Sequence, residues 1–227
     1  MAKQQAEQET LGEAMDKTEL FFEKNGRKLS YIFIALLILA GIIYGYRALI
    51  MQPREVRAAE MIAGAQNRFD AATPDFALAL EGDAEAAGFL AVIDEYGSTA
   101  SGNLAKHYAG ICYLRMGQFE NAAKYLAMYS PVDGIPGALV NAQNLGLQGD
   151  AAVELQKYAE AVKFYKAAVA AAENNLTAPL YLRKAALAEK AQGNKAAAVE
   201  LLQSVIDNYG GTRDAHDAEK MLGEVNE

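Results

Sequence analysis

An uninterrupted apolar segment lies near the N-terminus of the chain. Residues 29–46 read LSYIFIALLILAGIIYGY and contain no charged side chain, so that as a helix they would measure roughly 27 Å, close to the thickness of a bilayer's hydrocarbon core. The segment is apolar on every side, and Tyr31, Tyr44 and Tyr46 lie near its ends, where aromatic rings favour a membrane interface. The pattern predicts one transmembrane helix over residues 29–50.

Two other interpretations of this segment fit its flanks less well. A buried core helix would not need the basic residues that border it, Lys24, Arg27, Lys28 and Arg47. A cleaved signal peptide usually has an apolar region of about 7–15 residues that ends in small residues at a cleavage site. Here the sequence RALIM follows instead, at residues 47–51. We therefore expect the helix to remain in the membrane as an anchor.

The orientation of the predicted anchor stays open on charge alone. The basic residues close to its N-terminal side are Lys17, Lys24, Arg27 and Lys28, and those close to its C-terminal side are Arg47, Arg54 and Arg57. Because cytoplasmic flanks carry an excess of Lys and Arg, a count of four against three decides little.

The N-terminal tail, residues 1–28, has the pattern of a short amphipathic helix. Thr10 and Glu13 form a capping-box pattern, and Gly26 is placed to end the helix. The residues that recur at helical spacing are Leu11, Met15, Thr18 and Phe22. Two interpretations remain open: this side of the helix rests on the bilayer surface or on a partner helix, or the tail is solvated.

Residues 51–227 contain an internal repeat with a fixed spacing of small residues. Three windows that begin at Gly110, Gly149 and Ala186 align without gaps. The alanines at the same offset are Ala122, Ala161 and Ala198; they are preceded by Phe119, Tyr158 and Lys195, and followed by Leu126, Tyr165 and Leu202, then by Tyr129, Ala168 and Val205. Two helices can approach closely only where small residues face each other, so each window predicts a helical hairpin.

A second internal match places one more hairpin before these windows and one helix after them. VIDEYGST at residues 92–99 matches VIDNYGGT at residues 205–212, and each segment would end one helix and introduce the next. The earlier hairpin would then pair helices over residues 54–69 and 84–96, with a long loop or a short extra turn between them. A terminal helix is expected over residues 214–225, with Asp214 as its cap.

Charge and composition exclude one class of partner. The chain has 21 basic and 29 acidic residues, and residues 51–227 alone hold 15 and 23. Nucleic acid binding needs a clustered basic surface, which this acidic domain lacks, so we expect no nucleic acid partner.

The residues that could support catalysis do not converge. His107 and Cys112 are five residues apart, about 140° around a helix, so they do not face one cleft. The lone Cys112 lies among apolar residues and is expected to be a buried small hydrophobe. His216 lies beside Asp214 and Asp217 at a predicted helix start, as in a solvated polar turn. We expect no enzyme activity, no cofactor and no metal site.

The repeat windows resemble the tetratricopeptide repeat family. Their segments ICYLRMGQFENAAKYL, DAAVELQKYAEAVKFYKAAV and LAEKAQGNKAAAVELLQSVI look like successive second halves of such repeats. The spacings of 39 and 37 residues exceed the family's 34, and the excess falls in the connections PVDGIPG and ENNLTAP, at residues 131–137 and 173–179. The third window departs most, because Glu189 stands where a large aromatic is usual. The resemblance implies an all-α solenoid of helical hairpins that binds other proteins.

The whole chain resembles the YfgM-type ancillary subunits of the bacterial Sec translocon. The resemblance lies in the order of tail, single span and degenerate repeats, and it includes the segment LQGDAAVELQKY at residues 147–158. This resemblance implies a single-pass protein of the bacterial inner membrane with its repeat domain in the periplasm. It also implies SecYEG, periplasmic chaperones or client polypeptides as partners. A scaffold for another envelope complex, in cell-wall synthesis or a dedicated secretion system, is the alternative.

In such a solenoid the first helix of each hairpin lines a concave groove. The residues expected there are Leu104, His107, Ile111, Leu114 and Arg115, then Asp150, Val153 and Glu154, then Leu180, Arg183, Leu187 and Lys190. A groove that is apolar with a charged edge suits an extended or helical peptide with hydrophobic side chains, and Arg115 and Arg183 could fix a carboxylate or a carbonyl. The apolar members could equally pack between neighbouring hairpins.

Overall fold

Helices and no strand make up the regular secondary structure of the part that the structure describes. The computed structural model describes the backbone of residues 2–226 and the side chains of residues 23–224. It divides into two units, Met1–Pro53 and Arg54–Glu227. Within the described residues the only pairing of β type is an isolated bridge between Gly82 and Ala87. The prediction of an all-α protein is therefore confirmed.

The first unit consists of helix α1, Ala2–Tyr46, and the π-helical segment η1, Arg47–Met51. With α2, Gln52–Phe69, these segments form one continuous run whose described part, from Glu23 onward, is long and apolar enough to cross a membrane. Its most apolar window has a mean hydropathy of 2.1, and none of that window is buried against protein.

One expectation about the tail is wrong. Helix α1 continues through Gly26 rather than ending there, and the Ser30 hydroxyl donates a hydrogen bond to the Gly26 carbonyl at 2.6 Å, one turn earlier. A glycine inside a helix costs only about 1 kcal/mol, which a long helix absorbs. The side chains of Thr10 and Glu13, and the amphipathic face of Leu11, Met15, Thr18 and Phe22, lie outside the residues whose side chains the structure describes.

The second unit opens with α2 and two short helices, α3, Phe76–Glu81, and α4, Phe89–Tyr96. The short extra turn expected between the two helices of this hairpin is α3. Helix α4 begins at Phe89, five residues after its predicted start at residue 84. The cause is a tight loop in which the Asp83 carboxylate accepts hydrogen bonds from the amides of Glu85 and Ala86 and from Arg68 of α2. These bonds lower the pKa of Asp83 and hold the loop out of helix.

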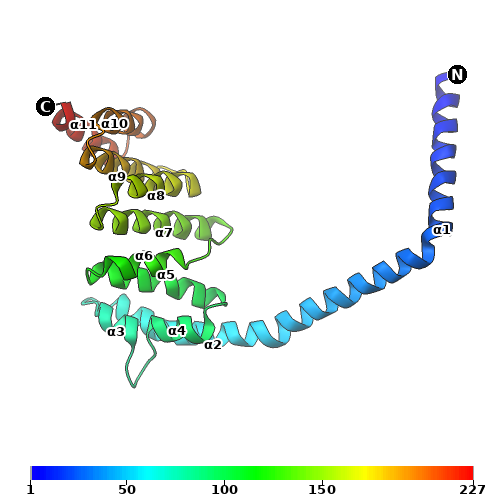
Figure 1. Cartoon of the computed structure of the whole chain (residues 1–227), viewed down its shortest axis with the longest axis horizontal. Helices are drawn as coiled ribbons and strands as arrows, with labels where there is room; N and C mark the ends of the chain where they lie inside the picture. Colours follow the sequence, from blue (N-terminus) through cyan, green and yellow to red (C-terminus); the bar gives the residue numbers. More distant parts are fainter. Residues whose placement is uncertain (1, 227) are drawn as a thin grey trace. The chain divides into compact units, whose positions relative to one another are not determined.

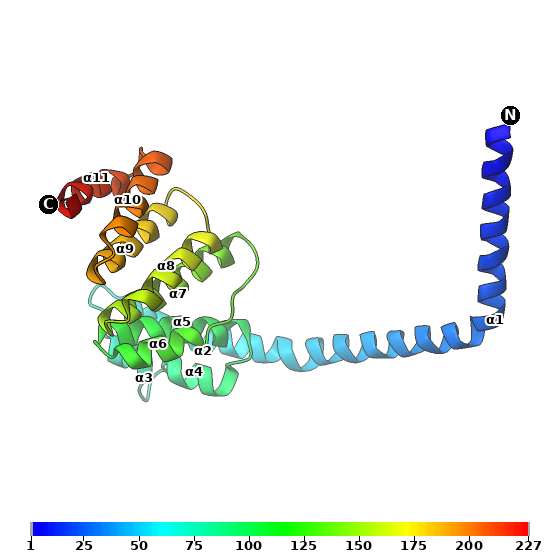
Figure 2. The same cartoon turned by 45° about the horizontal axis from the view of Figure 1, so that its top comes forward.

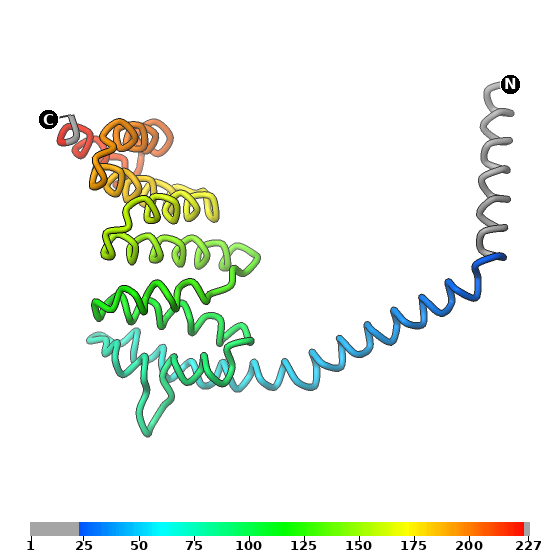
Figure 3. Tube along the Cα trace, in the orientation of Figure 1, coloured from blue at the N-terminus to red at the C-terminus, as the bar shows by residue number. Residues whose placement is uncertain are grey.

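Three further hairpins and a terminal helix stack on the hairpin of α2 and α4, and they rise above it in Figure 1 (Figures 1 and 2). They are α5, Ala100–Arg115, with α6, Phe119–Ala127; α7, Ile135–Glu154, with α8, Tyr158–Ala171; α9, Ala178–Ala191, with α10, Lys195–Tyr209; and the terminal α11, Arg213–Asn226. Figure 3 traces the chain back and forth through this stack, so that α5, α7 and α9 run in the same direction.

The structure confirms the repeat frame. Ala122, Ala161 and Ala198 are each fully buried, and α6, α8 and α10 begin at the residues that precede those alanines by three positions. A Cβ on Gly149 would lie 2.5 Å from the ring of Tyr165 on the other helix of the same hairpin. The small residues are therefore required by the close approach of the paired helices.

The matched turns before α5 and α11 also have the same geometry. The Thr99 hydroxyl donates to the Tyr96 carbonyl at 2.7 Å and accepts from the Gly102 amide at 3.0 Å. Thr212 repeats both bonds, to the Tyr209 carbonyl at 2.8 Å and from the Ala215 amide at 3.2 Å. Thr212 is thus the cap of α11, and the expectation of Asp214 as cap is wrong because the Asp214 carboxylate pairs with Arg183 at 2.8 Å.

Candidate functional site

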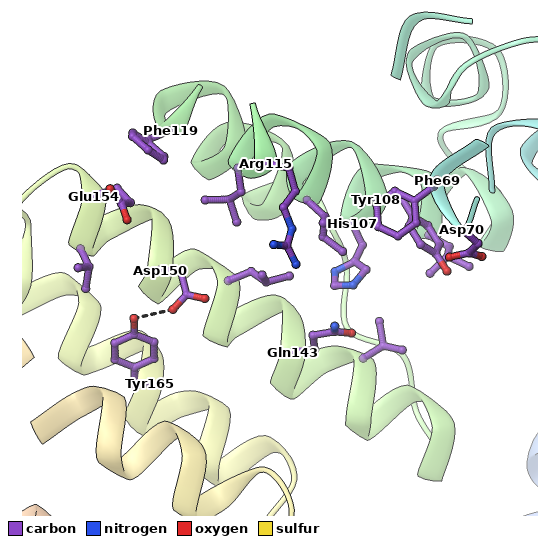
Figure 4. A pocket seen from close by; sticks show the side chains of 16 residues that line it. Phe69, Asp70, His107, Tyr108, Arg115, Phe119, Gln143, Asp150, Glu154 and Tyr165 are labelled. Atoms are coloured by element: carbon purple, nitrogen blue, oxygen red, sulfur yellow. Dashed lines mark hydrogen bonds between the residues drawn. The ribbon is translucent and has the colours of Figure 1, made fainter. Parts of the chain in front are cut away.

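A groove of about 680 Å³ lies between α5 and α7, next to the C-terminal end of α2 (Figure 4). Its lining residues are Phe69 and Asp70; Leu104, His107, Tyr108, Ile111, Leu114, Arg115 and Phe119; Val140, Gln143, Leu147, Asp150, Val153 and Glu154; and Tyr165. Eight of the twelve residues expected to line a concave surface are among them. The structure thus brings together the predicted residues of the first two repeats.

The apolar walls of the groove come from the spacing of side chains on two neighbouring helices. Leu104, Ile111 and Leu114 are separated by seven and three positions on α5, so they lie on one face. Val140 and Leu147 repeat the seven-residue spacing on α7. These side chains are only partly buried, apart from Ile111, which is 9% exposed. Apolar surface is therefore available to a ligand in the groove.

An internal polar network fixes one side of the groove. The Asp150 carboxylate accepts a hydrogen bond from the Tyr165 hydroxyl at 2.7 Å, and both its oxygens lie 2.8 Å from Lys184 Nζ. Burial raises the pKa of Tyr165, and the adjacent Asp150 raises it further, so the phenol stays protonated and donates. Asp150 is consequently engaged within the protein, although it borders the groove.

His107 is a buried member of the lining, with 3% of its surface exposed. Its Nδ1 lies 3.2 Å from Nδ2 of Asn144, which suits a neutral imidazole that accepts from the amide. Burial lowers the pKa of His107 to about 4, and a hydrogen bond with Gln143 only partly opposes this. The ring is therefore uncharged near neutral pH, and it joins α5 to α7.

Arg115 is the cationic side chain of the groove. It is exposed at the C-terminal end of α5, and it makes no hydrogen bond or ion pair with any residue whose side chain the structure describes. Figure 4 shows its guanidinium directed into the groove from α5. A guanidinium has five donors in a planar fork, so this position can bind a carboxylate or a backbone carbonyl of a ligand.

The residues expected from the third repeat do not line this groove. Arg183 donates from Nε to Asp214 of α11 at 2.8 Å, with both side chains about four-fifths buried, and is thus a structural link between α9 and α11. Leu180 packs in the core that α7, α8 and α9 share. Leu187 and Lys190 are exposed on α9 outside the groove. The predicted groove is therefore shorter than the repeat frame suggested.

Sequence reasoning also missed several lining residues. Phe69 and Tyr108 belong to an aromatic cluster in which their ring centroids are 5.0 Å apart, and this cluster places the end of α2 at one end of the groove. The other missed residues are Asp70, Phe119, Val140, Gln143, Leu147 and Tyr165. Val140 and Leu147 could have been found from their spacing with Glu154 on the predicted first helix, since seven residues are nearly two turns.

Cys112 is buried and His216 is exposed, as the sequence predicted for each side chain. Cys112 is a buried free thiol, fully enclosed by the core of the first hairpins, and burial raises its pKa to about 12. His216 is exposed and lies 3.5 Å from Glu219, one turn along α11. Among the described residues, no three His, Cys, Asp or Glu side chains are grouped as metal ligands would be.

Comparisons with known proteins agree with this geometry. A family model described as "Tetratricopeptide repeat" matches residues 181–212. A solved structure of TPR-like repeats assigned to a kinesin light chain of Podosopora anserina, in a single-substitution variant, superposes with a TM-score of 0.50 at 15% identity, covering 77% of this chain and 84% of that chain. The structure without the substitution gives 0.49 at the same identity and coverage. No curated protein sequence matches the chain.

Tetratricopeptide repeats form a non-enzymatic type of scaffold for protein interactions, and the likeness in structure at this identity concerns the fold alone. The matched repeat comprises most of α9 and α10 and ends at Thr212. The hairpins before it follow the same frame of buried alanines. Residues 181–212 thus match a tetratricopeptide repeat, and the stacked hairpins share the fold of solved TPR-like repeats.

Proposed function

We propose that this chain is a membrane-anchored module that binds a segment of a partner polypeptide in the groove between α5 and α7. The observation that supports this function is the groove itself, where apolar side chains of both helices surround Arg115, which has no partner among the described side chains. Two further pockets of the repeat domain, of about 380 and 490 Å³, are smaller than this groove.

The chemistry of the groove defines the class of segment that fits. Leu104, Leu114 and Leu147 would bury apolar side chains of an extended or helical peptide. Arg115 would then bind a carboxylate or a backbone carbonyl of that peptide. Asp70 and Glu154, which also line the groove, disfavour a strongly acidic peptide, since like charges repel. The ligand is therefore a mainly apolar segment with an acceptor group opposite Arg115.

Replacing Arg115 with Glu is expected to weaken this binding without affecting folding. The side chain is exposed and unpaired, so the melting temperature should remain unchanged, while loss of a charge-assisted hydrogen bond costs about 1.5–3 kcal/mol, on the order of 10- to 100-fold in affinity. The measurement is photo-crosslinking from p-benzoylphenylalanine placed at Leu114 in the full chain, in its native membrane. The adduct formed from position 114 should decrease strongly in the Arg115→Glu background.

Arg183→Glu is the matched control, because it reverses the same charge outside the groove. It should break the Asp214 ion pair and lower the melting temperature, while the adduct from position 114 persists at a temperature where the protein is folded. A photoreactive side chain at Leu187, on α9 beyond the groove, should give no such adduct. An unchanged adduct in Arg115→Glu would show that the partner does not use this groove.

The anchor supports the same function through effective concentration. The helix from Glu23 onward is long and apolar enough to cross a membrane, and Lys24, Arg27, Lys28 and Arg47 flank its apolar part. A domain held beside its partner reaches effective concentrations on the order of millimolar, so that weak individual contacts suffice. The groove has one cationic contact and modest apolar walls, and we infer that it depends on such tethering.

For its place in the cell, we propose an accessory role at a bacterial protein-export translocon, with the repeat domain outside the cytoplasm. The resemblance in architecture to the YfgM-type subunits supports this role, and client polypeptides or chaperones would supply the apolar segments. The alternative is a scaffold for another envelope complex. Purification of the full chain in mild detergent should recover the SecYEG subunits, and their absence from the eluate together with subunits of another complex would favour the alternative.

A further inference from the structure

The edge of the repeat domain at which α2 begins is held together by hydrogen bonds. The Glu55 carboxylate, in the first turn of α2, accepts from the Ala100 amide at 2.6 Å and from the Ser101 amide and hydroxyl at 3.0 and 2.6 Å. Arg54 also donates to the Glu95 carbonyl at 2.6 Å. The start of α2 is thereby fixed beside the N-terminal end of α5.

The same edge continues through the connection between α6 and α7. Asn103, in the first turn of α5, exchanges two hydrogen bonds of 2.8 Å with the backbone of Ser130. Asn141 of α7 in turn accepts from the Val132 amide at 3.0 Å and donates to its carbonyl at 2.9 Å. Because α5, α7 and α9 run in parallel, the α8–α9 connection lies along this edge as well (Figures 1 and 3).

These connections present apolar side chains to the solvent. Val132 is 47% exposed, Ile135 is 83% exposed, and Leu176 in the α8–α9 connection is 74% exposed. Val132 and Leu176 stand on loops whose backbone is held in place, since the Asn141 side chain bonds to Val132 and the Asn174 side chain accepts from the amides of Leu176 and Thr177. Ile135 is the first residue of α7 and is fixed by that helix. Large apolar side chains on fixed loops have a cost in water that a contacting surface would remove.

A short length of chain joins the α2 end of this edge to the predicted membrane helix. Arg54, which is fixed to the edge, follows Ile50, the last residue of the predicted span, by four positions. Four residues extend over at most about 14 Å. The α2 end of the edge therefore cannot move far from the bilayer surface, whatever the angle at which the helix leaves it.

We propose that this edge rests on the lipid bilayer, with Val132, Ile135 and Leu176 inserted among the headgroups and the upper acyl chains. The proposal depends on the membrane anchoring proposed above. Apolar side chains at an interface typically enter by about 5–10 Å, which suits single residues on loop tips. Asp133 and Glu173 lie on the same loops, so the contact is apolar and shallow and does not depend on attraction to anionic lipid.

The test uses tryptophan fluorescence, since the chain contains no tryptophan. The full-length Ile135→Trp variant is reconstituted into vesicles of phosphatidylethanolamine and phosphatidylglycerol with brominated acyl chains, which quench an indole that reaches them. Leu187→Trp is the control, because Leu187 is also exposed but lies far along α9 from this edge. Quenching of the indole at position 135 should exceed that at position 187 several-fold, and Leu176→Trp should resemble Ile135→Trp.

Each outcome separates this inference from the function on which it rests. Flotation of the vesicles reports the anchor, and a chain that fails to float with them would overturn the anchoring and the edge contact together. A chain that floats with equal quenching at positions 135 and 187 would overturn the edge contact alone. An indole at position 135 that is unquenched by lipid but shifts its emission when solubilised membrane proteins are co-reconstituted would assign the edge to a protein partner and also overturn the lipid contact.

Discussion

Gly102→Ala is expected to lower the free energy of unfolding of the repeat domain by about 3 kcal/mol, at the upper end of the usual cost of overpacking. A Cβ at this position would fall on the carbonyl oxygen of Tyr96, inside van der Waals contact. That carbonyl already accepts hydrogen bonds from the Thr99 amide and hydroxyl, so it cannot move without breaking the turn before α5. Urea unfolding of the full chain in mild detergent, followed by circular dichroism, measures the change.

Gly223→Ala is the control for this substitution. Gly223 lies in α11, and beyond the adjacent backbone of that helix no atom lies within 4 Å of the added Cβ. The change should therefore leave stability unaltered or raise it by up to about 1 kcal/mol through helix propensity. Equal stabilities for Gly102→Ala and the unmodified chain would contradict the close approach of the two backbone segments. The substitution Gly102→Ala should also weaken the attachment of α2, because Glu55 of α2 accepts hydrogen bonds from the amides of Ala100 and Ser101 in the same turn.

Acidification is expected to destabilise the domain through His107. Its pKa in the folded protein is about 4, below the ordinary value of 6.5 that applies to the unfolded chain. The unfolded state therefore binds the proton more readily, and stability that is fully present above pH 6.5 is lost as the pH falls from 6.5 towards 4. A difference of this size corresponds to about 3 kcal/mol at most, because each unit is worth about 1.4 kcal/mol.

The His107→Gln variant isolates this effect. Glutamine can maintain a hydrogen bond with Asn144 but does not titrate, and the carboxylates and the exposed His216 are unchanged in the variant. The difference in unfolding free energy between the two proteins should change by about 3 kcal/mol between pH 6.5 and pH 4, in favour of the variant at low pH. Parallel stability curves over this interval would indicate that His107 is protonated at its ordinary pKa, and hence that it is solvated.

The repeat frame could be predicted because local requirements determine it. Ala122, Ala161 and Ala198 are small because a second helix packs against them, and this requirement recurs at a regular spacing that the sequence displays. The matched Tyr-Gly-Xaa-Thr turns were predictable for the same reason, since the hydroxyls of Thr99 and Thr212 bond to residues three positions away on either side. Both features recur at matching positions of the chain, and this repetition makes them visible in the sequence.

Features that depend on distant partners could not be predicted in this way. The late start of α4 results from the hydrogen bond of Asp83 with Arg68, fifteen residues earlier in the chain. Arg183 does not line the groove because it forms an ion pair with Asp214, which lies 31 residues later. The groove extends to Phe69 through contact of its ring with Tyr108. In each case the decisive partner lies on another helix, and no periodicity in the sequence indicates it.

The enclosure of Cys112 has a practical consequence for labelling chemistry. It is the single cysteine of the chain, and burial raises the pKa of its thiol to about 12, so that the reactive thiolate is scarce at pH 7. The folded protein should therefore behave towards maleimides as if it had no cysteine. Spin labels or fluorophores can then be attached at a cysteine introduced on any exposed helix, with Cys112 left in place and the packing around it undisturbed.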